Sequence, residues 1–311
     1  MNNIFAFREA LGRFYGKHDT ILRMLLKYVI AFGSFQAINV YLNQAVPVNH
    51  LLVSAVLAAF CMFLPSNSMI LMAAAVALIH FYAISLEAAL AGGGMMIIAM
   101  LFYFSIAPES AIPAVLTALA MMGGIPGTIA MCLGLMNGPL SAVGVLYGVF
   151  FSRLLYITKD IGGNLQAASA DAAEAMVQKM TELMRAVTAD REMLVLMAAL
   201  VLTLWIVYLV RKAEIKYAWL VASLTGLLAY VAVRIGAGFF MEVSFANFTF
   251  MIDCIIGVIV AILAQIFLFG LDYHKTERIQ FEDDEFYYYV KAIPKRRSRR
   301  KKKIRRGERR R

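Results

Sequence analysis

The chain has 311 residues, of which 61% are hydrophobic and 16% are charged, and its mean hydropathy is +0.72. This composition excludes an ordinary soluble protein and predicts an all-α polytopic membrane protein. The formal charge of +10 is concentrated in residues 295–311, where 13 Lys and Arg stand against one Glu, a local +12 that leaves −2 for the rest. The basic pI therefore reflects one terminal tract and does not indicate a nucleic-acid-binding domain.

Residues 1–20 form a basic amphipathic segment that carries Arg8, Arg13 and Lys17. No small-residue cleavage motif follows the first apolar run, so we expect this run to remain as a membrane helix and not to be removed with a signal peptide. Because positively charged flanks stay inside, the segment is predicted to be cytoplasmic.

Stretches of about 20 apolar residues, the length that a membrane-spanning helix requires, recur along the chain. They predict about eight spans, at residues 24–43, 48–65, 68–86, 88–107, 138–156, 193–211, 216–239 and 247–270. The spans form two groups. Residues 21–156 are predicted to be an N-terminal membrane bundle, and residues 193–271 are predicted to be the C-terminal membrane helices.

A break interrupts the apolar segment 111–138. It consists of Gly123, Gly124, Pro126 and Gly127. The pattern fits either one kinked span or a helical hairpin that enters and leaves on the same side. Both chain ends are basic and therefore predicted to be cytoplasmic, which requires an odd number of crossings before residue 157. Only the hairpin gives this parity, so a re-entrant broken helix is predicted.

Residues 157–192 are the one sizeable hydrophilic insert between spans, and parity predicts that they are extracytoplasmic. Asp171 and Glu174 fit a capping box. An apolar face at helical spacing follows, made of Met176, Met180, Leu183, Met184 and Val187. The predicted amphipathic helix could pack on the mouth of the bundle, lie on the outer leaflet, or pair with a partner.

The sequence contains no motif of the soluble enzyme classes: there is no Walker A loop, GxGxxG, HExxH or GxSxG. Cys61, Cys132 and Cys254 all lie in apolar stretches, without the spacing of a zinc or redox site. No catalytic, cofactor-binding or metal-binding residues are predicted, no cofactor is implied, and we do not expect an enzyme.

Two opposite charges lie at matching positions in the last two spans. Arg234 and Asp253 are each about six or seven residues from the connection between these spans, or roughly 10 Å deep. Because an unpaired charge inside a membrane is costly, an intramembrane ion pair is predicted. The pair could lock the two helices together, or it could act as a proton or ion relay.

Uncharged polar residues also occur within the spans. Gln36, Asn39 and Asn43 form a stripe on the first span, and His80 is a single polar residue in the third. The stripe could face a cavity or hydrogen-bond a neighbouring helix, and helix contact is the preferred interpretation. His80 is likewise expected to be an interhelical donor and not a site.

Small residues at GxxxG spacing cluster between residues 123 and 148 and indicate close helix packing. The pairs are Gly123 with Gly127, Gly134 with Gly138, and Gly144 with Gly148. Irregular backbone at membrane depth is tolerated only where it is buried in protein or lines a water-filled path. Transporters use such half-helices to bind substrates, although no second broken segment is visible here.

Residues 272–311 are predicted to be a cytoplasmic tail in two parts. The first part is acidic and tyrosine-rich, with Ile279, Phe281, Phe286 and Val290 suggesting a short strand-like docking segment. The second part is polybasic and is expected to contact anionic phospholipid. Its predicted contact residues are Lys295, Arg296, Arg297, Arg299, Arg300, Lys301, Lys302, Lys303, Arg305 and Arg306. Nucleic acid or the ribosome is the alternative partner for these charges.

The run FEDDEFYYYVKAIPK, together with the preceding DYHKTERIQ, resembles the end of an uncharacterised family of bacterial polytopic membrane proteins. The resemblance extends over the membrane body, in the LPSNS turn and the apolar stretch at residues 68–106. The resemblance implies that the protein lies in a bacterial cytoplasmic membrane. It implies no activity and no site residues.

These features leave the function open between two main readings. The preferred one is a non-enzymatic assembly or scaffold component of a membrane complex, with a protein partner or a second copy of the chain as its companion. The alternative is a transporter or permease subunit that uses the broken helix and the pair Arg234 and Asp253. In both readings the protein is a multi-pass protein of the cell membrane with both termini in the cytoplasm.

Overall fold

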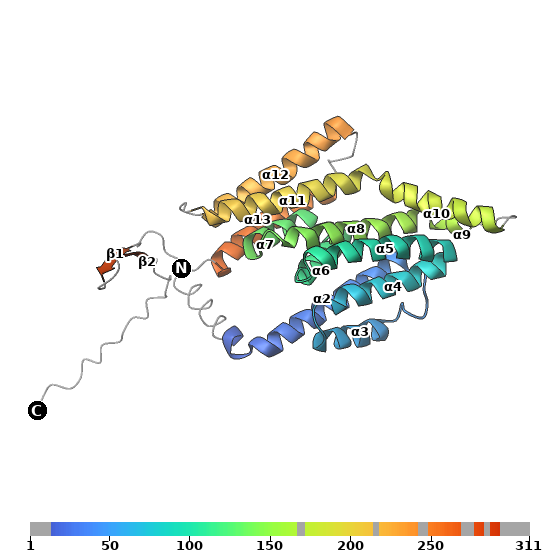
Figure 1. Ribbon diagram of the computed structural model, residues 1–311, viewed down its shortest axis with the longest axis horizontal. Coiled ribbons are helices and arrows are strands. Elements are labelled where there is room, and N and C mark those ends of the chain that lie inside the picture. The colour runs from blue at the N-terminus through green and yellow to red at the C-terminus, as the bar shows by residue number, and fades with distance from the viewer. Residues whose placement is uncertain are drawn as a thin grey trace, which may run out of the picture. The chain divides into compact units, whose positions relative to one another are not determined.

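The computed structural model describes residues 14–166, 172–213, 218–241, 248–268, 277–282 and 287–292. The chain divides into two units, one made of Arg23–Gln265 and one made of Met1–Leu22 with Ile266–Arg311. The first unit is a bundle of helices (Figure 1). The second contains a strand pair, which is described separately below.

The helices occur where the apolar stretches predict them. They are α2 (Asp19–Leu42), α3 (Leu51–Phe63), α4 (Ser68–Ile84), α5 (Leu86–Ile106), α6 (Ala111–Met122), α7 (Pro126–Met136), α8 (Ser141–Asp160), α9 (Gly162–Gln166), α10 (Ala172–Thr188), α11 (Arg191–Lys212), α12 (Ala218–Met241) and α13 (Phe248–Leu268). Capping residues fix several starts. The Ser85 hydroxyl accepts the Ala88 N–H at 3.1 Å at the start of α5, and Pro126 begins α7 at a position that needs no N–H donor.

A buried polar network fixes the connection between α2 and α3 against α4. The Nδ1 atom of His80, which is fully buried, accepts the backbone N–H groups of Gln44 and Ala45 at 3.3 and 3.0 Å. Its Nε2 atom lies 2.9 Å from Asn39 Oδ1, and the Asn39 amide donates to the Val48 carbonyl at 2.7 Å. An imidazole that accepts at Nδ1 donates at Nε2, so His80 is the neutral interhelical donor that was predicted.

Helices α6 and α7 form a hairpin. The Ser110 hydroxyl, just before α6, donates to the Leu140 carbonyl, just after α7, at 3.4 Å, although 30 residues separate them. At the break the Gly123 and Ile125 N–H groups donate back to α6 carbonyls at 2.9 Å each, and Gly124 has a φ of +74°. That left-handed conformation favours glycine and ends a helix. The chain therefore reverses direction at the break, as a hairpin does and a kinked span does not.

The glycine pair Gly144 and Gly148 lets α8 contact α6 closely. A Cβ added at Gly144 would lie 2.6 Å from the Ser110 carbonyl oxygen, and one added at Gly148 would lie 2.5 Å from the Ala114 carbonyl oxygen. Both distances are too short for a carbon atom. These two residues thus have the close-packing role that their spacing predicted, whereas a Cβ at Gly138 would meet nothing within 4 Å.

The amphipathic helix α10 packs against α5 and α8. Two residues of its predicted apolar face, Leu183 and Val187, are buried, and Met184 is 46% exposed. Of the three alternatives for this helix, the described contacts fit packing on the bundle. Asp171 and the Glu174 side chain, which suggested the capping box, lie outside the described residues and side chains.

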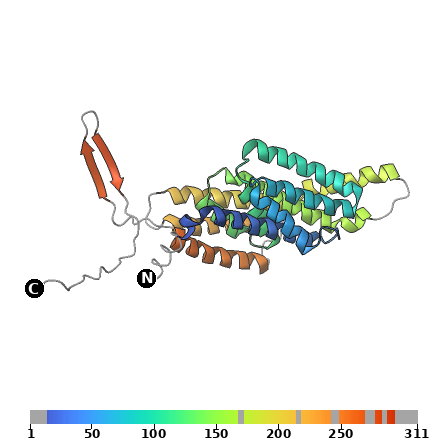
Figure 2. The same ribbon diagram turned by 90° about the horizontal axis from the view of Figure 1, so that it is seen from below.

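The strand-like segment of the tail is a β-hairpin. Strand β1 (Glu277–Glu282) pairs antiparallel with β2 (Tyr287–Ala292) (Figure 2). In this pairing Ile279 lies opposite Val290. The described residues up to 268 form an all-α unit, as predicted, and this strand pair follows them in the chain. The polybasic residues 293–311 and the N-terminal residues 1–13 lie outside the described part of the chain.

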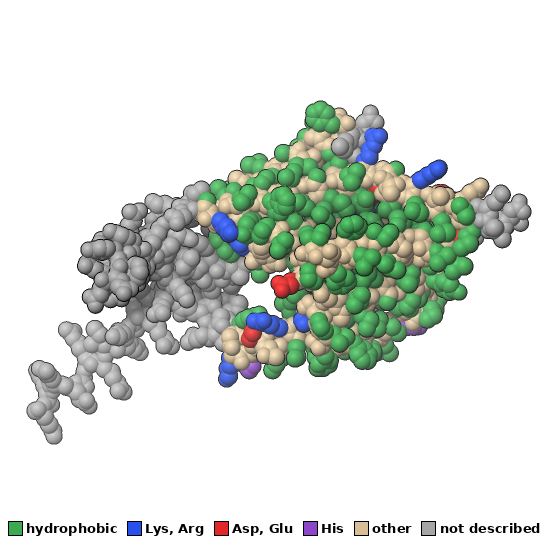
Figure 3. All heavy atoms as spheres, viewed as in Figure 1, with side chains coloured by type: hydrophobic (Ala, Val, Ile, Leu, Met, Phe, Trp, Pro, Cys, Tyr) green, Lys and Arg blue, Asp and Glu red, His purple; other side chains and the backbone are tan. Residues whose placement is uncertain are grey.

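Five helical stretches are long and apolar enough to cross a membrane. They are Asp19–Leu42, Leu86–Ile106, Ser141–Asp160, Met176–Lys212 and Ala218–Phe240. Helix α3, with 13 residues, and helix α4, with 17, are shorter, so the count of eight spans is not confirmed. Hydrophobic side chains predominate on the face shown in Figure 3, and charged ones are few. Such a surface is typical of a membrane protein.

Candidate functional site

A charged cavity of about 410 Å³ lies at the tip of the α6–α7 hairpin, and we call it the hairpin-tip cavity. Four helices contribute its charged side chains. These are Arg153 of α8, Glu192 of α11, Arg234 of α12 and Asp253 of α13. Tyr41, Tyr156 and Tyr230 also line it, beside the backbone of Gly123 and Gly124. Charged residues are rare in spans, so a cavity that gathers four of them is a functional candidate.

Asp253 fixes the hairpin tip. Its carboxylate accepts the Gly127 N–H at 2.8 Å, the Thr128 N–H at 2.9 Å and the Thr128 hydroxyl at 2.8 Å. These are the first donors of α7, where the helix dipole favours a negative charge. Asp253 is 1% exposed, so its charge is stabilised by these donors and not by water. Helix α13 is thereby joined to a hairpin 125 residues earlier in the chain.

Arg234 lies in the same cavity without the ion pair that its depth predicted. It is 6% exposed, and its Nε and Nη1 atoms have no hydrogen-bond partner. Its guanidinium carbon is 5.7 Å from the centre of the Phe250 ring. Among the described residues, no ion pair joins Arg234 to Asp253, and the aspartate carboxylate instead accepts from the α7 donors. Arg234 and Asp253 line the same cavity, as their matching positions predicted, but the predicted ion pair between them does not form.

A second charge cluster closes the cavity on the side of α8 and α11. Arg153 Nε and Nη2 donate to the Asp190 carboxylate at 2.7 and 3.0 Å, and Nη1 lies 3.0 Å from Glu192 Oε2. Asp190 also caps α11 by accepting the N–H groups of Glu192 and Met193. A bidentate arginine–carboxylate pair of this kind is well oriented. The cluster therefore connects the C-terminal half of α8 to the start of α11.

An apolar pocket of about 510 Å³ adjoins the cavity, and we call it the lateral pocket. It lies between α2, α6 and α7, and its apolar lining includes Ala37, Val40, Leu116, Ala120, Ile125 and Ile129. Tyr41, Met122 and Gly123 line both the lateral pocket and the hairpin-tip cavity. At its polar end, Lys159 Nζ lies 4.5 Å from the centre of the Tyr41 ring.

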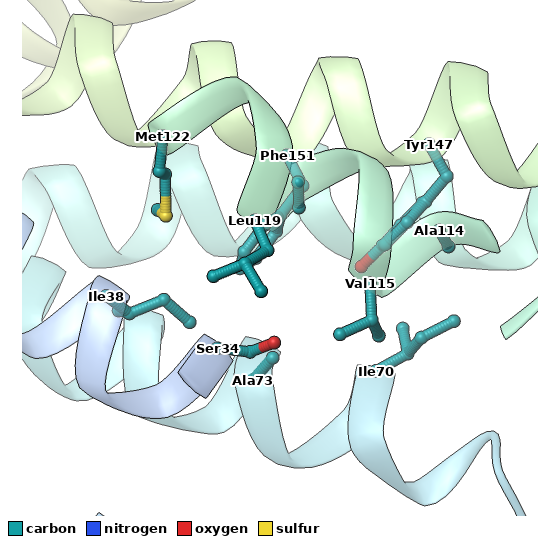
Figure 4. Close-up of a pocket in the computed structure, with 11 residues that line it drawn as sticks. Ser34, Ile38, Ile70, Ala73, Ala114, Val115, Leu119, Met122, Tyr147 and Phe151 are labelled. Carbon is teal, nitrogen blue, oxygen red and sulfur yellow. The ribbon is translucent and has the colours of Figure 1, made fainter. Parts of the chain in front are cut away.

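A third space is too small for a substrate. It has a volume of about 20 Å³ and lies between α2, α4, α6 and α8, where Ser34, Leu119 and Tyr147 surround it (Figure 4). Its Tyr147 hydroxyl has no hydrogen-bond partner, and a space of this size admits about one water molecule.

The other residues that the sequence singled out lie partly at the cavity, partly at helix contacts and partly outside the described residues. Gly123, Gly124, Pro126 and Gly127 form the break, and the first three line the cavity. A Cβ at Gly127 would lie 2.5 Å from the Tyr230 ring. Gly134 packs against α11, 2.8 Å from the Leu204 carbonyl oxygen by the same measure. The predicted lipid-contact residues at 295–306 lie outside the described residues. Within the described residues, no group of three or more His, Cys, Asp or Glu side chains could hold a metal ion.

Sequence reasoning missed the cluster around Arg153. This arginine is the first Lys or Arg after Lys27, and it lies inside the predicted span 138–156. Asp190 and Glu192 stand at the predicted start of the next span, on the same predicted side as the end of α8. A search for opposite charges at the same depth, applied to all pairs of spans, would have found the cluster.

Comparisons of the chain with protein-family models, curated proteins and solved structures find no match. The resemblance of the tail to a bacterial membrane protein family therefore stays a prediction.

Proposed function

We propose that the chain is a permease-type membrane protein that binds an anionic substrate in the hairpin-tip cavity. One observation carries the proposal: a buried arginine, Arg234, lines the cavity with Nε and Nη1 unpartnered. A buried cation whose donors are unused has a cost that an anionic ligand would offset. The hairpin tip supports this reading, because broken helices at membrane depth line substrate paths in transporters.

The proposal includes a topology. Helices α2, α3, α4, α5, α8, α11, α12 and α13 cross the cell membrane, and the α6–α7 hairpin is re-entrant from the cytoplasmic side. Both termini are cytoplasmic, and the cavity faces the extracytoplasmic side. The basic residues Arg211 and Lys212, at the end of α11, support this orientation.

The test is anion-dependent stabilisation of the purified protein in detergent. The probes are inorganic phosphate, acetate, glycerol phosphate and hexyl phosphate, and the readout is the midpoint of thermal unfolding. We expect at least one probe to raise the midpoint of the wild type and of Arg191→Gln, whose exposed arginine at the start of α11 lines none of the three spaces described above. The Arg234→Gln variant should lose the shift. Anion-dependent currents from proteoliposomes would then connect binding to transport.

A result in which no anion stabilises the wild type would contradict the proposal. So would equal stabilisation of the wild type and Arg234→Gln, because Arg234 would then not be the binding group.

An assembly component remains a second candidate, supported by the β-hairpin of the tail. A two-stranded ribbon has open edges that can pair with another chain. If this candidate is right, a partner should co-purify with the full chain and be lost when residues 277–292 are deleted.

A further inference from the structure

Two spaces of opposite character share lining residues at the hairpin tip. The hairpin-tip cavity is charged, the lateral pocket is apolar, and they share Tyr41, Met122 and Gly123. A ligand that filled both would need a polar end and an apolar end. This inference rests on the proposed function and specifies its substrate class.

The polar end favours a negative charge. Asp253 is engaged by the α7 donors and Glu192 by Arg153, so the carboxylates of the cavity already have partners. The Nε and Nη1 atoms of Arg234 do not have partners, and Lys159 lines the polar end of the lateral pocket. Arg234 lines the hairpin-tip cavity, and Lys159 lines the lateral pocket beside the shared Tyr41, so each space supplies one cation to an anionic headgroup.

The apolar end suits a hydrocarbon chain. Between Gly123 and Leu116 the lateral pocket follows α6 for seven residues, about 10 Å at 1.5 Å per residue. Ala37 and Val40 of α2 form the opposite wall. Each methylene buried there contributes about 0.8 kcal/mol in transfer from water. A small soluble anion would use none of this surface.

We propose that the site binds one anionic phospholipid, with its headgroup toward Arg234 and Lys159 and an acyl chain in the lateral pocket. The lipid enters sideways between α2 and the hairpin.

The test uses the full chain in non-ionic detergent with three probes: dioleoyl phosphatidylglycerol, dioleoyl phosphatidylcholine and glycerol phosphate. The readout is the midpoint of thermal unfolding as a function of probe concentration. Ala37→Trp fills the lateral pocket, and Ala75→Trp is the matched control at an exposed α4 position that lines neither space. Lys159→Gln removes an exposed charge, so a loss of folding does not complicate it.

We expect the wild type and Ala75→Trp to bind phosphatidylglycerol at least fivefold more tightly than phosphatidylcholine. Ala37→Trp should weaken phosphatidylglycerol binding at least fivefold, and Lys159→Gln should reduce the preference for the anionic lipid. The polybasic tail is intact in every variant, so lipid contact by the tail cannot produce these differences.

Equal lipid binding by Ala37→Trp and Ala75→Trp would overturn the lipid proposal. Stabilisation by glycerol phosphate as strong as that by phosphatidylglycerol would also overturn it, while leaving the proposed anion site in place. If neither these probes nor the anions of the preceding test act on the wild type, both proposals are wrong.

Discussion

Asp253 acts as a helix cap that comes from another helix. Its carboxylate receives two backbone N–H groups and one hydroxyl at the start of α7, all at 2.9 Å or less. When an exposed capping side chain is removed, water can accept the helix N–H groups in its place. The donors at the start of α7 are buried, so water does not replace Asp253 as their acceptor. The contribution of Asp253 to stability is therefore the free-energy cost of leaving these α7 donors unpaired inside the bundle.

We predict that Asp253→Ala lowers the free energy of unfolding by about 1–3 kcal/mol, the usual cost of unpaired buried donors. Asp253→Asn keeps one acceptor oxygen and should lose less. Thermal unfolding in detergent measures both. Thr128→Val, which removes only the hydroxyl contact, is the control and should be the mildest of the three. Equal stability of the wild type and Asp253→Ala would show that the cap does not hold the hairpin.

Asn39 and His80 form a second buried contact, in which the polar atoms of both side chains make hydrogen bonds. His80→Phe keeps the ring volume but leaves the Gln44 and Ala45 N–H groups without their acceptor. We therefore expect a loss of about 1–3 kcal/mol from two orphaned donors. His50→Phe is a suitable control, because no side-chain cap bond joins His50 to α3. If both phenylalanine variants unfold at the same temperature, the network adds no stability.

At the scale of helices, the contact between α6 and α8 depends on two glycines. An alanine at Gly148 would place its Cβ 2.5 Å from the Ala114 carbonyl oxygen, so α6 and α8 must separate. Separation costs dispersion contacts along both helices. We predict that Gly148→Ala destabilises the protein by about 1–3 kcal/mol. Gly138→Ala adds its carbon in open space, so it should leave the stability unchanged. The midpoints of thermal unfolding of the two variants measure this difference.

Helix positions were largely predictable because the apolar stretches and their Gly and Pro interruptions mark them. The partners of individual polar side chains were not. Asp253 was assigned to Arg234 because both are charged and equally deep, whereas its partners are backbone N–H groups of α7, which carry no signal in the sequence. The Gly and Pro break left a kinked span or a hairpin open, and charge parity chose the hairpin. Its closing contact joins Ser110 to Leu140, two residues with no charge.

For the whole molecule, the proposed topology places the two ends of the hairpin on one side of the membrane. Single cysteines at Glu109 and Leu140, in a chain whose Cys61, Cys132 and Cys254 are replaced by Ala, should react with an impermeant maleimide only after cells are permeabilised. A cysteine at the exposed Val46, in the connection between α2 and α3, should react in intact cells. Labelling of Glu109→Cys and Leu140→Cys from opposite sides would show that the segment crosses the membrane.

The depth of Arg234 has an electrical consequence. It lies seven residues before the end of α12, about 10 Å, or roughly a third of a 30 Å hydrocarbon core. An anion that reached it would cross about that share of the membrane potential, which is worth about 2.3 kcal/mol per charge for each 100 mV. With the cavity facing outward and the cell interior negative, a monovalent anion would bind about 0.8 kcal/mol less tightly per 100 mV, close to fourfold. Occupancy of the site would then report the energised state of the membrane.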